Sequence, residues 1–66
     1  MNKVAGYRKM LGMSQNVMAK EFGISGQAYR LKEKGEVNFT KKEMLKFREL
    51  LRKEIFPSIT IDEIFF

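Results

Sequence analysis

The residues of this sequence best suited to chemistry are its basic side chains, which are concentrated in the first two thirds of the chain. Residues 1–42 contain nine Lys and Arg residues against three Glu residues, a net charge of +6, whereas residues 43–66 have a net charge of −1. A basic region of this kind attracts polyanions such as nucleic acid. A basic surface that only maintains solubility would have the same composition, so charge alone favours nucleic-acid binding only slightly.

Enzymatic chemistry has little support in the sequence. The chain has no Cys and no His, which removes the commonest metal ligands and the commonest general base. No nucleophile is paired with a base, no carboxylates cluster, and Gly23 and Gly26 lack the preceding strand of a phosphate-binding glycine loop. We therefore expect a protein without enzymatic activity, metal, cofactor or small-molecule ligand.

The length of 66 residues predicts one small domain that spans residues 1–66. The first residues lack the apolar run of a signal peptide. No stretch approaches the roughly 20 apolar residues that a membrane span requires. These features predict a cytoplasmic protein that does not bind a membrane.

Turn residues divide the sequence into five predicted helices and no strands, which is an all-α fold. Apolar residues recur at helical spacing between the turns, and the predicted helices cover about residues 2–11, 15–22, 26–34, 41–54 and 61–66. Ser14 and Ser25 are predicted N-caps, and capping boxes are expected at 40–43 and 60–63. Val17 and Ile55 are expected to contribute to the apolar sides of their helices.

Residues 14–35 have the pattern of two short helices joined by a tight turn. Gly23 can adopt the left-handed backbone that such a turn needs, and Ile24 can anchor the turn in the core. Ala19 is small enough to let the two helices cross closely. This arrangement would hold the next helix away from the body of the domain, where its first half can enter a DNA major groove about 12 Å wide.

This pattern resembles the helix-turn-helix of the lambda-repressor/Cro-like proteins, also called the Xre family. The resemblance covers nearly the whole chain and depends on Arg8, Ser14-Gln15, Ala19, Gly23-Ile24-Ser25, Tyr29, Glu33-x-Gly35 and a C-terminal helical pair. It implies a lambda-repressor-like DNA-binding domain with its helix-turn-helix at about 14–35. The helix at about 26–34 is then the recognition helix for double-stranded DNA.

The resemblance also implies roles for individual residues. Base contacts are implied for the exposed positions of the recognition helix, where Gln suits adenine, Arg suits guanine or a phosphate, and Leu suits a thymine methyl: Gly26, Gln27, Arg30 and Leu31. Phosphate contacts are implied for Ser14, Gln15, Ser25, Lys34, Asn38, Lys41 and Lys42. Arg8 and Glu33 are implied to form a structural ion pair.

Two residues depart from the family pattern. Gly26 stands where many relatives have a long polar side chain that reads a base, so one specific contact is expected to be missing. Lys32 stands where many relatives have an apolar residue. Its stem is expected to lie on Tyr29 while its ammonium group reaches solvent.

The predicted function is therefore a phage- or prophage-type transcription regulator, either a repressor or a Cro-like switch protein. It is expected to bind a pseudo-palindromic operator as a homodimer. The candidate dimer surface is formed by Ile61, Ile64, Phe65 and Phe66, which can equally well close the domain's own core. The alternative function is a protein-interaction module, like an antirepressor, which keeps the fold but binds another regulator. Gly26 favours this alternative, whereas the basic charge favours DNA.

Overall fold

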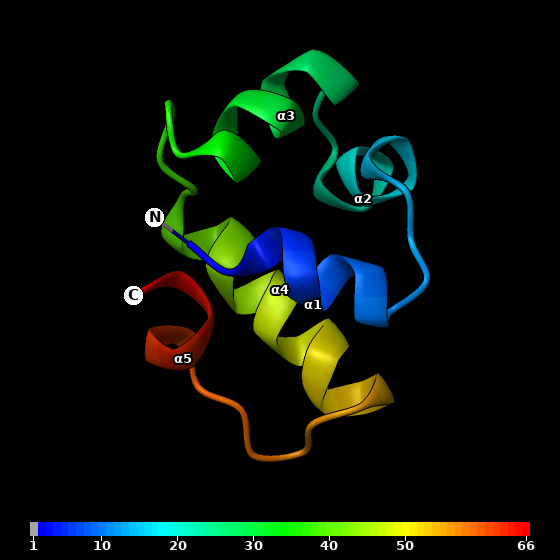
Figure 1. Cartoon of the computed structure of the whole chain (residues 1–66), viewed down its shortest axis with the longest axis vertical. Helices are drawn as coiled ribbons and strands as arrows, with labels where there is room; N and C mark the ends of the chain where they lie inside the picture. The colour runs from blue at the N-terminus through cyan, green and yellow to red at the C-terminus, as the bar shows by residue number, and fades with distance from the viewer. Residues whose placement is uncertain (1) are drawn as a thin grey trace.

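A computed structural model describes residues 2–66, which form five α-helices and no strands (Figure 1). The helices are α1 (Val4–Met10), α2 (Gln15–Phe22), α3 (Gly26–Lys34), α4 (Lys41–Glu54) and α5 (Ile61–Phe65). Figure 1 shows α2 and α3 together at one end of the molecule, with α1 and α4 below them and α5 beside the N-terminal segment. None of these helices is long and apolar enough to cross a membrane.

The helix boundaries follow the turn residues that the sequence predicts. Ser14 and Ser25 each accept a hydrogen bond from the amide three residues later, at 3.1 Å. Both predicted capping boxes are present, at the starts of α4 and α5. Gly23 and Gly35 end α2 and α3 with φ angles of 71° and 88°, a left-handed backbone that residues with a side chain rarely adopt. The five predicted helices are thus confirmed, with ends within about two residues of those expected.

The N-terminal segment is tied to two other parts of the chain, which explains why α1 begins at Val4. The side-chain oxygen of Asn2 accepts a hydrogen bond from the Val4 amide at 3.2 Å, while its Nδ2 donates to the carbonyl of Lys32 at 3.1 Å. The backbone amide of Lys3 donates to the carbonyl of Ile64 at 2.9 Å. These bonds join the start of the chain to α3 and to α5.

A cluster of aromatic rings from α2 to α5 forms the centre of the core. Phe22, Tyr29, Phe39, Phe47 and Phe65 contact one another at tilted or edge-to-face angles, with ring centroids 5.3 to 6.3 Å apart. Such pairs add about 0.5–1.5 kcal/mol each beyond the burial of their surface. The largest fully buried side chains are Tyr29, Phe47, Met18, Leu51, Ile64 and Val4.

Two residues that helical spacing places in the core are exposed instead. Val17 is 44% exposed, because the buried side of α2 runs through Met18 and Ala19 and leaves Val17 at its edge. Ile55 is 37% exposed, since it lies past the last turn of α4 with a non-helical backbone and so does not continue the buried side of that helix. The expectation that both residues pack in the core was wrong.

The candidate dimer surface is largely buried within the domain itself. Ile64 is fully buried and Phe65 is 8% exposed, with its ring 5.3 Å from that of Phe39. Ile61 is half-buried against the same core. Ile64 and Phe65 therefore close the domain's own core, which is one of the two roles that the sequence left open for them.

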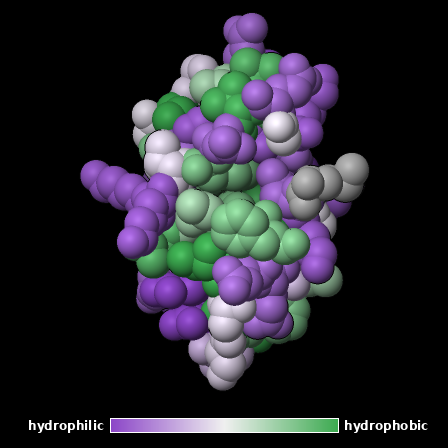
Figure 2. All heavy atoms as spheres, turned by 90° about the vertical axis from the view of Figure 1, so that its left-hand side faces the viewer, coloured by the Kyte–Doolittle hydropathy of each residue, from purple (hydrophilic) through white to green (hydrophobic). Residues whose placement is uncertain are grey.

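Phe66 is the exception, with 80% of its surface exposed. It lines a shallow hollow with Val37 and Met44, on the face formed by α5 and the segment between α3 and α4. Figure 2 shows apolar residues gathered across the middle of this face, with polar residues above and below them. Of the four residues expected at a dimer surface, only Phe66 presents most of its side chain to solvent.

Replacing Thr40 with Ala should lower the free energy of unfolding by about 1 kcal/mol, because the Thr40 hydroxyl caps α4 by accepting a bond from the Glu43 amide at 3.2 Å. Urea unfolding followed by circular dichroism measures the change. Ser58→Ala removes an exposed hydroxyl outside the helices and should change stability by less than about 0.5 kcal/mol. Equal stabilities for the two variants would show that the cap contributes nothing.

Candidate functional site

One side of α3 in the helix pair α2 and α3 faces solvent. The turn at 23–25 joins the two helices, and Ala19 of α2 is almost completely buried, which allows close packing. In contrast, Tyr29 is the only buried residue among the nine residues of α3. The exposed residues of α3 are Gln27, Arg30, Leu31 and Lys34. The helix lies at the end of the molecule opposite α5 (Figure 1).

Three of the four expected base-contacting residues are exposed on α3. Gln27, Arg30 and Leu31 all have exposed side chains. Their spacing of three and four residues places them on one side of the helix. Gly26 is half-buried, because the side chain of Asn16 from α2 lies over it. The structure therefore brings an amide, a guanidinium and an apolar group together on one outward surface.

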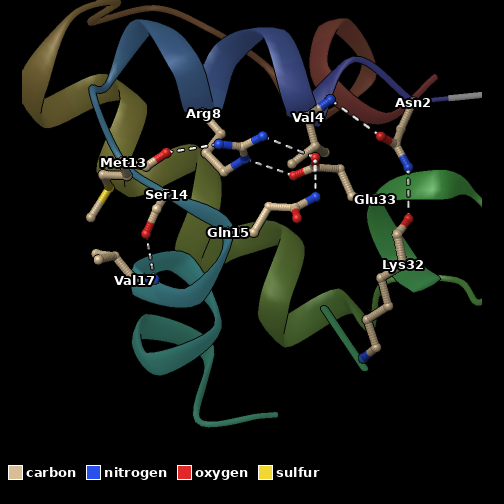
Figure 3. A network of polar contacts seen from close by, with 9 residues as sticks. All are labelled: Asn2, Val4, Arg8, Met13, Ser14, Gln15, Val17, Lys32 and Glu33. Carbon is tan, nitrogen blue, oxygen red and sulfur yellow. Dashed lines mark hydrogen bonds and ion pairs between the residues drawn. The ribbon is translucent and has the colours of Figure 1, made fainter. Parts of the chain in front are cut away.

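A buried ion pair fixes this helix pair against α1. The guanidinium of Arg8 donates two hydrogen bonds to the Glu33 carboxylate, from Nε to Oε2 at 2.9 Å and from Nη2 to Oε1 at 3.1 Å (Figure 3). The third nitrogen, Nη1, donates to the carbonyl of Met13 at 2.8 Å. The side chains of Arg8 and Glu33 are only 10% and 7% exposed. The ion pair expected between them is therefore present, and it links α1, the end of α3 and the segment before α2.

The charges of this pair stabilise each other in a poorly solvated place. Burial alone would raise the pKa of Glu33, but its hydrogen bonds, with that from Arg8 the strongest, hold the pKa below the ordinary value. The hydrogen bond to Glu33 raises the pKa of Arg8 in turn. Burial also raises the pKa of the Tyr29 hydroxyl, so this group stays neutral. The carboxylate of Glu33 is therefore ionised, and its partners lie inside the domain.

Gln15, an expected phosphate contact, has a structural partner that the sequence did not reveal. Its Nε2 donates to Oε1 of Glu33 at 3.0 Å, and the residue is half-buried (Figure 3). A Gln amide carries two N–H groups and a carbonyl oxygen, so one N–H and the oxygen remain available to a ligand. Glu33 thus orients the Gln15 amide at the start of α2 without using up its hydrogen-bonding groups.

The two N-cap serines lie at the starts of α2 and α3 with exposed side chains. The hydroxyl groups of Ser14 and Ser25 already accept a backbone amide. A hydroxyl that accepts one bond can still donate its own proton. Both groups therefore remain able to donate to a phosphate oxygen.

The other expected phosphate contacts are exposed but do not form one cluster. Lys34 is 3.2 Å from Glu36 in an ion pair whose side chains are 68% and 56% exposed, which contributes little to stability. Asn38 lines the hollow beside Phe66, whereas Lys42 lines a separate hollow between the ends of α2 and α4. Lys41 is exposed at the first position of α4.

The sequence predicted that the ammonium group of Lys32 reaches solvent, but the structure places it in a buried ion pair. Its Nζ lies 2.6 and 2.8 Å from the two carboxylate oxygens of Glu43, and both side chains are 12% exposed. The same carboxylate accepts the Thr40 amide of the capping box at 2.9 Å. Burial would raise the pKa of Glu43, but the bonds from Lys32 and Thr40 lower it overall. The expectation was wrong because the capping carboxylate lies within reach of α3, where it binds the ammonium group.

Comparisons with protein-family models, with curated proteins and with solved structures give no match. Residues 2–66 also contain no group of three acidic, His or Cys residues placed to hold a metal ion. The geometry of α2 and α3 is therefore the basis for a functional interpretation.

Replacing Glu33 with Ala should lower the free energy of unfolding by about 3 kcal/mol, because Arg8 would remain buried without its partner. Chemical unfolding measures this loss. Glu36→Ala is the matched control: it breaks an exposed ion pair and should cost less than about 1 kcal/mol. If both variants unfold at the same denaturant concentration, the buried pair does not stabilise the domain.

Acid should weaken the domain through the same carboxylate. The folded-state pKa of Glu33 lies below the value of 4.5 for an unpaired side chain, so its contribution is complete above pH 4.5 and disappears as the pH falls through the folded-state pKa. Glu33→Gln removes the titrating group, so its unfolding free energy should fall less steeply than that of the wild type below about pH 5. Urea midpoints measured across this range would be parallel for both proteins if Glu33 had no lowered pKa.

Proposed function

We propose that this chain is a lambda-repressor-like helix-turn-helix domain that binds double-stranded DNA sequence-specifically and regulates transcription. In this proposal α2 and α3 are the helix-turn-helix, and α3 is the recognition helix. The observation that carries the proposal is the outward surface of α3, on which Gln27, Arg30 and Leu31 are exposed together while Tyr29 packs in the core.

The chemistry of this surface suits the edges of base pairs in the major groove. The Gln27 amide can both donate to and accept from adenine, and Arg30 can donate two bonds to guanine. Leu31 can contact a thymine methyl group. A major groove about 12 Å wide admits one helix, so the three side chains would face the same groove.

Groups that bind phosphate surround this surface. The first amides of α2 and α3 lie beside the exposed serines Ser14 and Ser25, and helix N-termini attract anions. Gln15 would donate its second N–H to a phosphate from the position that Glu33 fixes. The net charge of +6 over residues 1–42 adds a long-range attraction to DNA.

The biological role that fits this chemistry is that of a repressor or a Cro-like switch protein. Two copies on one pseudo-palindromic operator would place their recognition helices in half-sites about 34 Å apart. Since Ile64 and Phe65 are buried, the contact between the copies would have to use other residues, such as Phe66.

The salt dependence of binding to a labelled duplex tests DNA binding itself. Phosphate contacts release counterions, so the logarithm of the binding constant should fall linearly with the logarithm of salt concentration, with a slope of about −0.9 per contact. A slope near zero, or no binding to any duplex at low salt, would contradict the proposal. Either result would favour the alternative function, a module that binds another regulatory protein.

Replacing Gln27 with Ala tests sequence reading by α3. On a duplex selected from a random pool by the wild type, the variant should bind roughly 5- to 150-fold more weakly, because a bidentate base contact contributes about 1–3 kcal/mol. Binding to random DNA should stay nearly the same. The control is the Ser58→Ala variant, because Ser58 is exposed and lies outside α2 and α3. This variant should bind both duplexes as tightly as the wild type does. An equal loss on selected and random DNA would show that Gln27 does not read a base.

A further inference from the structure

The first residue of α3 lies directly beneath a side chain from α2. A β-carbon added at Gly26 would be 2.6 Å from Oδ1 of Asn16, much closer than two such atoms can approach. Nη1 of Arg30 is 3.6 Å from the same point. The absence of a side chain at position 26 therefore allows a carboxamide from α2 and a guanidinium from α3 to approach the same point.

This convergence follows from the geometry of the two helices. Successive residues of a helix are about 100° apart around its axis, so Gln15 and Asn16 point in different directions. Gln15 turns inward to Glu33, whereas Asn16 is exposed and lies over the start of α3. Arg30 lies one helical turn after Gly26, so its long side chain extends back over the same position.

The two groups have complementary chemistry. An Arg guanidinium has only donors, whereas the Asn carboxamide has an acceptor oxygen as well as a donor nitrogen. An exposed Arg has many rotamers, and restricting them before binding reduces the entropy lost in forming a contact. No hydrogen bond joins the two groups in the free domain, but both lie within 4 Å of the same point, so the oxygen of Asn16 is near enough to limit the positions that the Arg30 guanidinium adopts.

We propose that Asn16 is a specificity-determining residue that positions Arg30 for base recognition, and that Gly26 leaves room for the Asn16 side chain to do so. This inference rests on the proposed function, since it concerns how the DNA-binding surface selects a sequence. If Asn16 has this role, α2 contributes to the choice of DNA sequence together with α3. The glycine at the start of α3 then leaves the space that the Asn16 side chain occupies.

The test compares base preferences among DNA duplexes selected from a random pool. Arg30→Ala first identifies the base pair at which Arg30 discriminates. Asn16→Ala should reduce discrimination at that same base pair by roughly 2- to 10-fold. The double variant Asn16→Ala/Arg30→Ala should discriminate no worse than Arg30→Ala alone, because Asn16 acts through Arg30.

Gly26→Ala provides a second, independent variant. Its new methyl group would displace the end of the Asn16 side chain, so its base preference should match that of Asn16→Ala. Gly6→Ala is the matched control, because a β-carbon at Gly6 meets nothing within 4 Å, and its base preference should equal that of the wild type. Melting curves establish that all variants are folded before their preferences are compared.

The outcomes separate this inference from the proposed function. If the wild type selects no sequence, the proposed function itself fails. If the wild type selects a sequence but Asn16→Ala and Gly26→Ala keep its preference, the role of Asn16 is wrong. Two further results would contradict positioning of Arg30 by Asn16. In the first, the double variant loses as much base discrimination as the two single variants together. In the second, Asn16→Ala changes the preference at a base pair that Arg30 does not read.

Discussion

The buried ion pair between Arg8 and Glu33 ties the end of α3 to α1. Tyr29 of α3 is fully buried in the aromatic core, whereas Gln27, Arg30 and Leu31 face outward. Packing around Tyr29 and the polar contacts of its last turn together hold the helix in place. Arg8 donates two hydrogen bonds to Glu33 and one to the Met13 carbonyl. These bonds hold the end of α3 against α1 and against the segment before α2. Because both side chains are buried, neither can lose its partner without leaving a desolvated charge behind.

Other polar contacts hold the same end of α3. Lys32 binds the Glu43 carboxylate of α4, and the Lys32 carbonyl accepts a bond from Asn2. These bonds also have an electrostatic consequence. Each of the two buried pairs, Arg8 with Glu33 and Lys32 with Glu43, is neutral as a whole, so the positive potential near α3 depends on the remaining basic side chains. The domain thus holds the last turn of α3 and presents the earlier turns to a ligand.

The sequence predicted the features of the fold that depend on local residue types. Helix starts and ends follow from N-cap hydroxyls and from glycines such as Gly23, which act over one turn of chain. The contacts that it missed join residues far apart in the sequence. Lys32 has the pattern of a solvent-exposed lysine, and nothing in its neighbourhood reveals that Glu43 approaches it in space. Asn16 has no local signal for its place over Gly26, because that contact requires the crossing of α2 and α3. The burial of Ile64 and Phe65 likewise depends on how α5 packs, and helical spacing alone left two roles open.

Backbone amide chemical shifts, recorded by NMR while the domain is titrated with a selected duplex, report directly on which surface binds DNA. Binding through α3 predicts that the largest shifts fall at the start of α2 and along residues 25–31, with small shifts in α5. The amides around Ser14 and Ser25 should shift through their phosphate contacts, and Phe66 should change only if two copies meet on the duplex. Shifts centred on the face of Val37 and Phe66 while α3 stays unchanged, or no shifts at all, would contradict recognition of DNA by α3.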